Sequence, residues 1–168
     1  MASLSGALQR SGETQDLGFT HRRETWDEMV DDIKPLLHDH WEELALYKDD
    51  IPLDPDFEQY RAIYDAGILR PYGTRLNGKL IGYALFTVTQ RHPHYKHRWA
   101  INDIIFIHPD HRNFGCGSGL FDCFEKELNS WGPVVIHITG KTDHPELAML
   151  LTARGYGHVE FGYSKRFT

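Results

Sequence analysis

The chain has 168 residues, of which 40% are apolar and 12% aromatic, a composition that suits one globular domain and excludes a disordered chain. Its formal charge is −6, from 18 basic and 24 acidic residues, which argues against nucleic acid as the main partner. The same charge mildly favours a cationic partner, although it is also an ordinary surface charge for a protein in water.

Cysteine usage and hydropathy suggest an intracellular location. Cys116 and Cys123 do not form a CxxC pair and are predicted to be free thiols in a reducing compartment, which favours the cytoplasm. No window approaches the roughly 18 apolar residues of a membrane span. The first residues lack a basic region followed by an apolar one, so we expect no signal peptide and no membrane partner.

The chain is predicted to begin with a tail and a strand. Residues 1–16 are rich in Ser, Gly and Gln without periodicity, and we expect them to form a flexible N-terminal tail. The remaining residues, 17–168, are predicted to form a single domain without internal repeats. Residues 17–22 (LGFTHR) fit a short first strand.

Two helices are expected next. Thr25 and Glu28 have the spacing of a capping box, and apolar residues then follow helical spacing at Trp26, Val30, Ile33, Leu37, Trp41 and Leu44. Pro35 lies inside this stretch and predicts a kink or a split.

The second predicted helix covers residues 54–67. Asp54 would cap it, Pro55 would occupy its first turn, and Gly67 would end it.

The second half of the chain alternates strands and helices. Asn77-Gly78 is the preferred pair for a type I′ turn and joins strands 70–76 and 79–90. A polar loop and a β-branched strand follow, and apolar spacing predicts a third helix marked by Leu120, Phe124, Leu128 and Trp131. The remaining elements are a strand over 133–139, a helix over 144–155 that stops at Gly155, and a final alternating strand over 156–167. This order indicates a mixed α/β (α+β) domain with one central sheet.

Residues 108–120 read HPDHRNFGCGSGL, with three glycines at alternate positions between a buried strand and a helix. Free N–H groups at a helix start and the absence of Cβ atoms suit binding of an anion such as phosphate. Two phosphate motifs fail by spacing, because no lysine follows the glycines as in a Walker A loop, and Leu120 stands where GxGxxG needs its last glycine. A tight turn that needs glycine for packing is the alternative.

A third pattern fits these residues. Arg112 to Gly117 match RxxGxG, preceded by Ile105-x-Ile107-x-Pro109 and followed by an amphipathic helix. This segment resembles the acetyl-CoA-binding segment of the GNAT (Gcn5-related N-acetyltransferase) superfamily, and the resemblance extends from about Tyr72 to Phe167. It implies a mostly antiparallel mixed sheet flanked by helices, with strands splayed at the acetyl-CoA site.

The resemblance also assigns the cofactor contacts. The loop amides of Arg112, Asn113, Phe114, Gly115, Cys116, Gly117 and Ser118 would hold the pyrophosphate of CoA, and the pantetheine arm would pair with Ile105, Phe106 and Ile107. His144 stands where many members have an asparagine that contacts CoA. Gly119 is expected to allow close packing rather than ligand contact. Cys116 lies at a helix start, which lowers a thiol pKa, but is interpreted as a small loop residue.

The implied reaction is direct attack of an amine on the thioester. A lysine-like amine has a pKa near 10.4 and must lose a proton first. Asp103, on the strand before the loop, is the predicted base, and burial among isoleucines would raise its pKa. A solvated or structurally paired Asp103 is the alternative. Leu151 occupies the position of the tyrosine that many members use as acid. Tyr156 and His144 are the candidate substitutes, by proximity only.

Other features leave alternatives open. Trp26, Trp41, Tyr47 and Tyr60 would either line an acceptor pocket or form core. His92, His94 and His97 form an irregular HxHxxH loop, for which a solvated or substrate-facing role is preferred over a metal site. No metal is expected.

The acceptor is predicted to be a small amine or a protein lysine or N-terminus, and a homodimer is left open. Residues 40–56 (HWEELALYKDDIPLDPD) resemble small acetyltransferase-like proteins of tailed bacteriophages, which would place the protein in a host cytoplasm. The competing function is a catalytically reduced fold of the same family that serves as a binding, regulatory or phage structural module.

Overall fold

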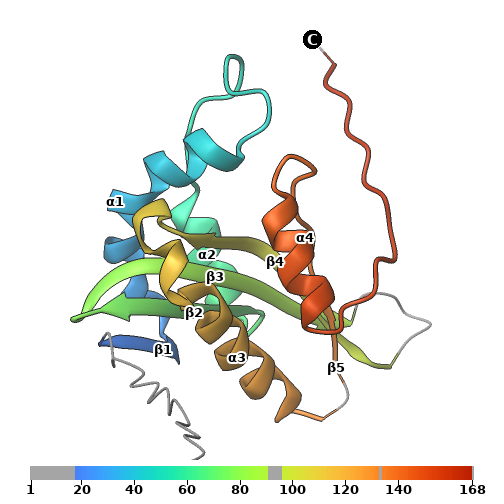
Figure 1. Ribbon diagram of the computed structural model, residues 1–168. Helices are drawn as coiled ribbons and strands as arrows, with labels where there is room; N and C mark the ends of the chain where they lie inside the picture. The colour runs from blue at the N-terminus through green and yellow to red at the C-terminus, as the bar shows by residue number, and fades with distance from the viewer. Residues whose placement is uncertain (1–17, 91–95, 133, 168) are drawn as a thin grey trace, which may run out of the picture.

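A computed structural model describes residues 18–90, 96–132 and 134–167 and shows a curved sheet with helices on both faces (Figure 1). The strands lie in the order β1-β2-β3-β4-β5. They are β1 (Phe19–Arg23), β2 (Leu69–Leu76), β3 (Lys79–Gln90), β4 (Arg98–Ile107) and β5 (Val134–His137). Among the described strands only the β4–β5 pair is parallel, so the predicted mixed, mostly antiparallel sheet is confirmed. The predicted tail over 1–16 lies outside the described residues, as do His92 and His94.

Helix α1 (Trp26–Leu44) begins at the predicted capping box. The Glu28 amide donates to Thr25 Oγ1 at 3.2 Å, and the Thr25 amide donates to Glu28 Oε2 at 2.9 Å. The helix runs without a break through Pro35, so the predicted split does not occur. Packing of the apolar face on both sides of the proline offsets the one hydrogen bond that proline removes.

Helix α2 (Phe57–Asp65) begins later than predicted. Asp56, not Asp54, is its N-cap, and its carboxylate accepts from the Gln59 amide at 2.8 Å. Asp54 and Asp56 are equally good capping residues by type, and the sequence alone did not distinguish them. Gly67 ends the helix region with a φ of 72°, as predicted.

The hairpin and the last two helices agree with the sequence. Asn77 and Gly78 have φ values of 50° and 84°, the positive pair of a type I′ turn. Helix α3 (Cys116–Asn129) follows a 3₁₀ turn over Pro109–Phe114, and α4 (Pro145–Ala153) is followed by Gly155 with a φ of 85°.

Two apolar cores cover the two faces of the sheet. On one face, α1 buries Trp26, Met29 and Ile33 against β3 and β4, and α2 packs beside it. On the other face, α3 buries Leu120, Phe124 and Leu128, and α4 packs its leucines, Leu151 among them, against this core. The two faces of the sheet are therefore covered by different helices. The environment of each β4 side chain depends on the face to which it points.

Two irregularities in β4 shape the molecule. Leu85 of β3 pairs with Ile104 and Phe86 pairs with Asn102, so Asp103 is an extra residue that forms a bulge. On its other edge, β4 pairs with β5 only over Arg98–Ile101. Beyond that point the two strands diverge, as the family resemblance implied.

The predicted final strand over 156–167 is wrong, because this segment forms neither a helix nor a strand. Beyond Tyr156 its apolar residues are exposed, with Phe161 77% and Tyr163 93% accessible. The segment runs past α4 toward the 46–56 segment (Figure 1), where the Tyr47 hydroxyl lies 3.1 Å from Ser164 Oγ. Alternation describes one chain segment, whereas a strand also needs a partner edge.

Gly119→Ala is expected to lower the free energy of unfolding by about 1–3 kcal/mol. A Cβ at this position would lie 2.3 Å from His21 Nε2, and the His21 ring is itself held by Thr74 Oγ1 at 3.0 Å. Gly117→Ala is the matched control, because nothing outside its own helix and its chain neighbours lies within 4 Å of an ideal Cβ there. Urea denaturation measures both variants, and equal losses would contradict the packing role of Gly119.

Candidate active site

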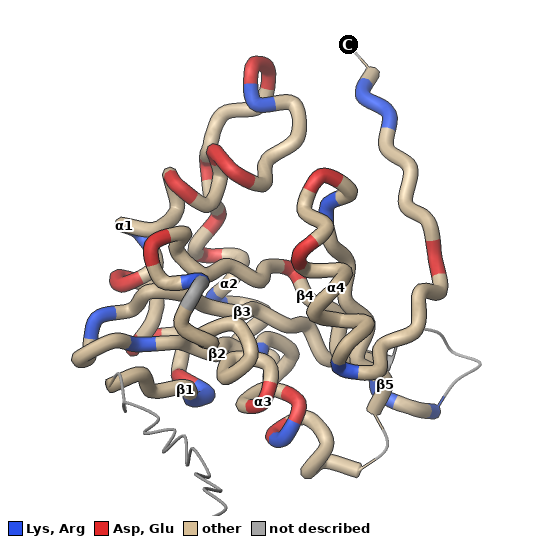
Figure 2. The backbone as a smooth tube through the Cα atoms, viewed as in Figure 1, with Lys and Arg blue, Asp and Glu red and all other residues tan. Residues whose placement is uncertain are grey.

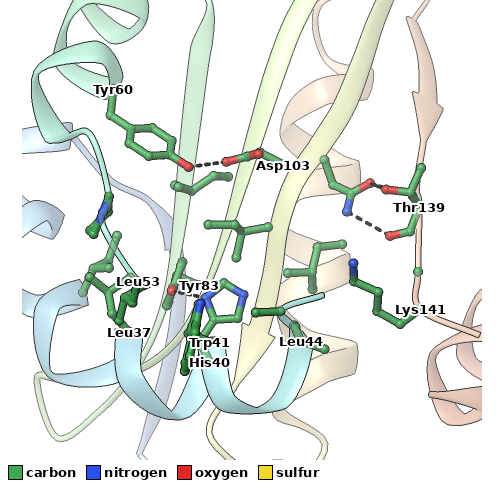
Figure 3. A pocket seen from close by; sticks show the side chains of 18 of the residues that line it. Leu37, His40, Trp41, Leu44, Leu53, Tyr60, Tyr83, Asp103, Thr139 and Lys141 are labelled. Atoms are coloured by element: carbon green, nitrogen blue, oxygen red, sulfur yellow. Dashed lines mark hydrogen bonds between the residues drawn. The ribbon is translucent and has the colours of Figure 1, made fainter. Parts of the chain in front are cut away.

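A cavity of about 460 Å³ lies between α1, α2 and the sheet and extends to the segment before α4 (Figure 3). Its walls come from five parts of the chain: α1, α2 with the segment before it, β3, β4, and α4 with the segment before it. Helices α1 and α2 contribute Leu37, Trp41, Phe57 and Tyr60, and the bulged part of β4 contributes Asn102 to Ile105. The cavity therefore lies where β4 and β5 diverge, and it contains the predicted catalytic residue Asp103.

Asp103 is held by a tyrosine from α2. The Tyr60 hydroxyl donates to Asp103 Oδ2, and the Tyr60 ring stacks on Trp26 with centroids 5.3 Å apart. Burial, together with this hydrogen bond to a carboxylate, raises the pKa of Tyr60. Asp103 itself is exposed, so the expected burial among isoleucines is not found. The bulge turns the carboxylate into the cavity instead.

A second polar pair lies in the same cavity. His40 Nδ1 is 2.8 Å from the Tyr83 hydroxyl, and the His40 ring lies against Phe106 with centroids 5.1 Å apart. Burial lowers the pKa of His40, against the opposing charges of Glu43 and Asp103. In a neutral imidazole one ring nitrogen donates and the other accepts a hydrogen bond, and His40 shares the cavity with Asp103.

Asn102 fixes the point at which β4 and β5 part. Its side-chain Nδ2 donates to the Thr139 carbonyl at 3.1 Å, and its Oδ1 accepts from the Thr139 amide at 2.7 Å. Asn102 is buried. One side chain thus satisfies both main-chain groups that a continued parallel ladder would have paired, and the strands diverge without leaving those groups unpaired.

The glycine segment forms an uncapped helix start. Gly115 takes the left-handed conformation with a φ of 77° and is the N-cap of α3, so no side chain caps the first turn. The first turn also contains no acidic residue. An ideal Cβ on Gly117 would meet nothing within 4 Å, which leaves the approach to this turn open. These residues fit a phosphate-bearing ligand, because first-turn N–H groups and the helix dipole both favour an anion.

Arg112 links the glycine segment to α1. Its Nε donates to the Ile107 carbonyl at 2.9 Å, and its Nη2 donates to Glu43 Oε2 at 2.5 Å. His144, at the start of α4, lies 3.8 Å from the same Glu43 carboxylate and 3.2 Å from Glu146. Although desolvation opposes it, hydrogen bonding to Glu146 and the nearby Glu43 raises the pKa of His144.

The other predicted cofactor residues surround this segment. Ile105 to Ile107 lie on the part of β4 that no longer pairs with β5. Phe114 is 54% exposed, Ser118 Oγ accepts from Arg154 at 3.1 Å, and Asn113 lies in the 3₁₀ turn. The structure thus brings the predicted cofactor residues to the mouth of the β4–β5 divergence and the start of α3.

Cys116 differs from its expected environment. Its side chain is 1% exposed and belongs to the core beneath α3. Burial raises the pKa of the Cys116 thiol, whereas its helix-start position suggested a lowered value. The residue therefore offers a main-chain amide at the helix start and no reactive thiol.

Of the two candidate acids, His144 lines the cavity and Tyr156 does not. The Tyr156 hydroxyl donates to Glu125 Oε1 at 3.0 Å, and its ring packs edge-on against Phe121, on the α3 side of the sheet. Leu151 packs against the same core. The hydroxyl groups that line the cavity with Asp103 belong to Tyr60, Tyr83 and Thr139.

Sequence reasoning missed Asn102, Tyr83, His40 and Glu43 as site residues. Of the four aromatic candidates, Trp26, Trp41 and Tyr60 line the cavity, whereas Tyr47 lies on the segment after α1. A polar pair, Asn102-Asp103, inside a β-branched strand was the one local signal available. Within the described ranges, no group of three or more His, Cys, Asp or Glu residues is placed to hold a metal ion.

Comparison with known proteins identifies the class. The model of the Acetyltransferase (GNAT) family matches residues 26–156 of this chain. The match covers more than half of the chain, and the protein belongs to this family. A search of curated proteins gave no match.

Solved structures agree in fold. A ribosomal-protein-alanine N-acetyltransferase from Brucella melitensis biovar Abortus 2308 is similar, with a TM-score of 0.68 and 20% identity over 89% of this chain and 98% of that one. An aminoglycoside acetyltransferase from an uncultured soil metagenomic sample, in complex with sisomicin, has a TM-score of 0.68 and 12% identity over 89% and 97%.

An aminoglycoside N-acetyltransferase in complex with CoA has a TM-score of 0.64 and 14% identity over 89% of this chain and 94% of that one. At these identities the three structures establish the shared fold. Over the parts of the chain that the structure describes, no helix is long and apolar enough to cross a membrane.

Proposed function

We propose that the protein transfers the acetyl group of acetyl-CoA to a primary amine by direct attack. One observation carries the proposal. A single cavity contains the Asp103 carboxylate and opens to the diverging edge of β4, which leads to the uncapped start of α3. An amine beside the carboxylate and a thioester entering along β4 would therefore meet, and no residue needs to hold the acetyl group between them.

The donor side is supported by charge and space. The open approach at Gly117 and the uncapped first turn suit a pyrophosphate, with the Arg112 guanidinium and the His144 imidazole, both beside Glu43, as further polar groups nearby. Arg112 uses part of its guanidinium on Glu43 and Ile107, and a guanidinium has five N–H donors in all. When bound, acetyl-CoA supplies the activated acetyl group; the chain orients it.

The acceptor side requires removal of a proton. A primary amine with a pKa near 10.4 arrives as an ammonium ion at neutral pH. Asp103 would bind this ion and take its proton, directly or through water, as the amine attacks. Tyr60 positions the carboxylate, because its ring is fixed on Trp26 and its hydroxyl donates to Asp103 Oδ2.

The leaving thiolate makes a smaller demand. A thiol pKa near 8.5 allows the thiolate to leave without a dedicated acid at neutral pH. The absence of Tyr156 from the cavity walls and the packing of Leu151 in the core are therefore compatible with transfer. The same two placements favour the competing function, a module of this family that binds CoA without transferring acetyl groups. Thiol release in the presence of amines distinguishes the two.

Gly117→Val is expected to weaken CoA binding by at least about 100-fold, because a branched side chain would enter the path of the phosphates. Nothing outside its own helix and its chain neighbours lies within 4 Å of an ideal Cβ at Gly117, so the fold should tolerate the change. Calorimetry with CoA measures the affinity, and a far-UV spectrum checks the fold. A folded variant that binds CoA as tightly as the unchanged protein would remove the loop from the cofactor site.

Asp103→Asn is expected to reduce acetyl transfer by about 100-fold or more, because the amide cannot accept the ammonium proton, while the affinity for CoA stays the same. Asp65→Asn is the control, since Asp65 is an exposed α2 carboxylate that does not line the cavity. Steady-state thiol release measures both variants. Unchanged turnover in Asp103→Asn would exclude this carboxylate as the base.

A further inference from the structure

We infer that the acceptor is a small primary monoamine with an apolar or aromatic body. This inference rests on the proposed function and names the substrate class of the same cavity. Three properties of the described walls lead to it: the number of carboxylates, the apolar character of the acceptor side, and the space available.

The charges of the cavity suit one ammonium group. Asp103 is the only Asp or Glu among the described residues that line it. The opposite side contributes Lys141, which Figure 3 shows beside Thr139 and away from Tyr60. Glu43 of α1, which does not line the cavity, pairs with Arg112. A second ammonium on the acceptor would lose water without gaining a counter-charge.

The walls around Asp103 suit an apolar body. Leu37 and Trp41 of α1, Leu53 and Pro55 of the segment after it, and Phe57 of α2 line the cavity on the acceptor side. Figure 3 shows Leu37 and Leu53 on the side of the cavity away from Thr139 and Lys141, below Tyr60. Hydrocarbon attached to the amine would be removed from water against these side chains.

The volume of the cavity and the charges outside it agree with a small apolar monoamine. About 460 Å³ must admit the thioester end of the donor as well as the acceptor, which favours a compact molecule. Acidic residues gather along α1 and the segment that follows it, outside the cavity (Figure 2). Exposed carboxylates attract any cation toward the mouth, but salt screens them. Selection among amines therefore depends on the inner walls.

Hexylamine and 1,6-diaminohexane form a matched pair that differs by one ammonium group. The diamine has two equivalent amines, so its kcat/KM is divided by two before the comparison. We expect kcat/KM for hexylamine to exceed this corrected value by about tenfold or more. Thiol release with saturating acetyl-CoA measures both, with mass spectrometry of the acetylated product. Phenethylamine should behave like hexylamine, and the polycation sisomicin should be a poorer acceptor.

A wall variant tests the physical cause. Leu53→Asp adds a carboxylate on a segment where Leu53 is already 38% exposed, and it should lower the ratio of hexylamine to diamine by about threefold or more. Leu53→Asn is the control, which changes polarity without adding charge and should leave the ratio nearly unchanged. An unchanged ratio in Leu53→Asp would contradict charge pairing as the cause.

The outcomes separate this inference from the proposed function. Acetylation of the diamine, of sisomicin or of a peptide N-terminus as efficiently as hexylamine would overturn the acceptor class and leave acetyl transfer intact. Absence of product with every amine, in protein that binds CoA, would overturn the proposed function. In that case calorimetry measures the affinities of hexylamine and the diamine for CoA-loaded protein, which tests the preference for a monoamine. Equal affinities would overturn the inference.

Discussion

The divergence of β4 and β5 depends on the pair of hydrogen bonds between the Asn102 side chain and the Thr139 main chain. A parallel ladder that ends inside a protein leaves amide and carbonyl groups without partners, at a cost of about 1–3 kcal/mol for each group. Asn102 satisfies both groups of Thr139 at the point where pairing ends, so β4 continues alone toward the glycine segment. The free edge of β4 beyond Asn102 lines the cavity and leads to the start of α3.

The bulge at Asp103 gives that free edge its chemistry. Without the extra residue, the strict alternation of β4 would keep successive side chains on opposite faces. With it, Asp103 and Ile104 both line the cavity, and Tyr60 holds the carboxylate there. The donor and acceptor sides therefore share one strand but differ in charge, since first-turn amides favour an anion and Asp103 favours a cation.

Contacts across the cavity connect the two sides. Glu43 of α1 binds Arg112 of the glycine segment and lies near His144 of α4. The helix that forms the acceptor wall is thus attached to the residues proposed to hold the donor. This arrangement gives both ligands a common frame and positions an amine relative to a thioester.

Local patterns were sufficient for most of the fold. The capping box at Thr25, the Asn77-Gly78 turn and the helix stop at Gly155 each depend on residues close in sequence, and each is confirmed. The spacing of Arg112 to Gly117 led to the family for the same reason. The strand predicted over 156–167 was wrong because alternation is also a local pattern. It does not show whether the edge of another strand is available for pairing.

The pairs of side chains that contact each other in the site could not be predicted from the sequence. Tyr60 and Asp103 are 43 residues apart, as are His40 and Tyr83, and Glu43 and Arg112 are 69 apart. No periodicity connects such positions, and only the packing of α1 and α2 on the sheet brings them together. The bulge that exposes Asp103 is likewise a property of two strands in register, so the sequence placed this residue in a buried strand.

The central claim is that one cavity holds donor and acceptor together, and initial-rate kinetics tests it most directly. Rates of thiol release would be measured with acetyl-CoA and hexylamine varied against each other. The account predicts double-reciprocal lines that intersect, because both ligands must be bound before the acetyl group moves. Parallel lines, the pattern of an acetylated enzyme intermediate, would contradict it.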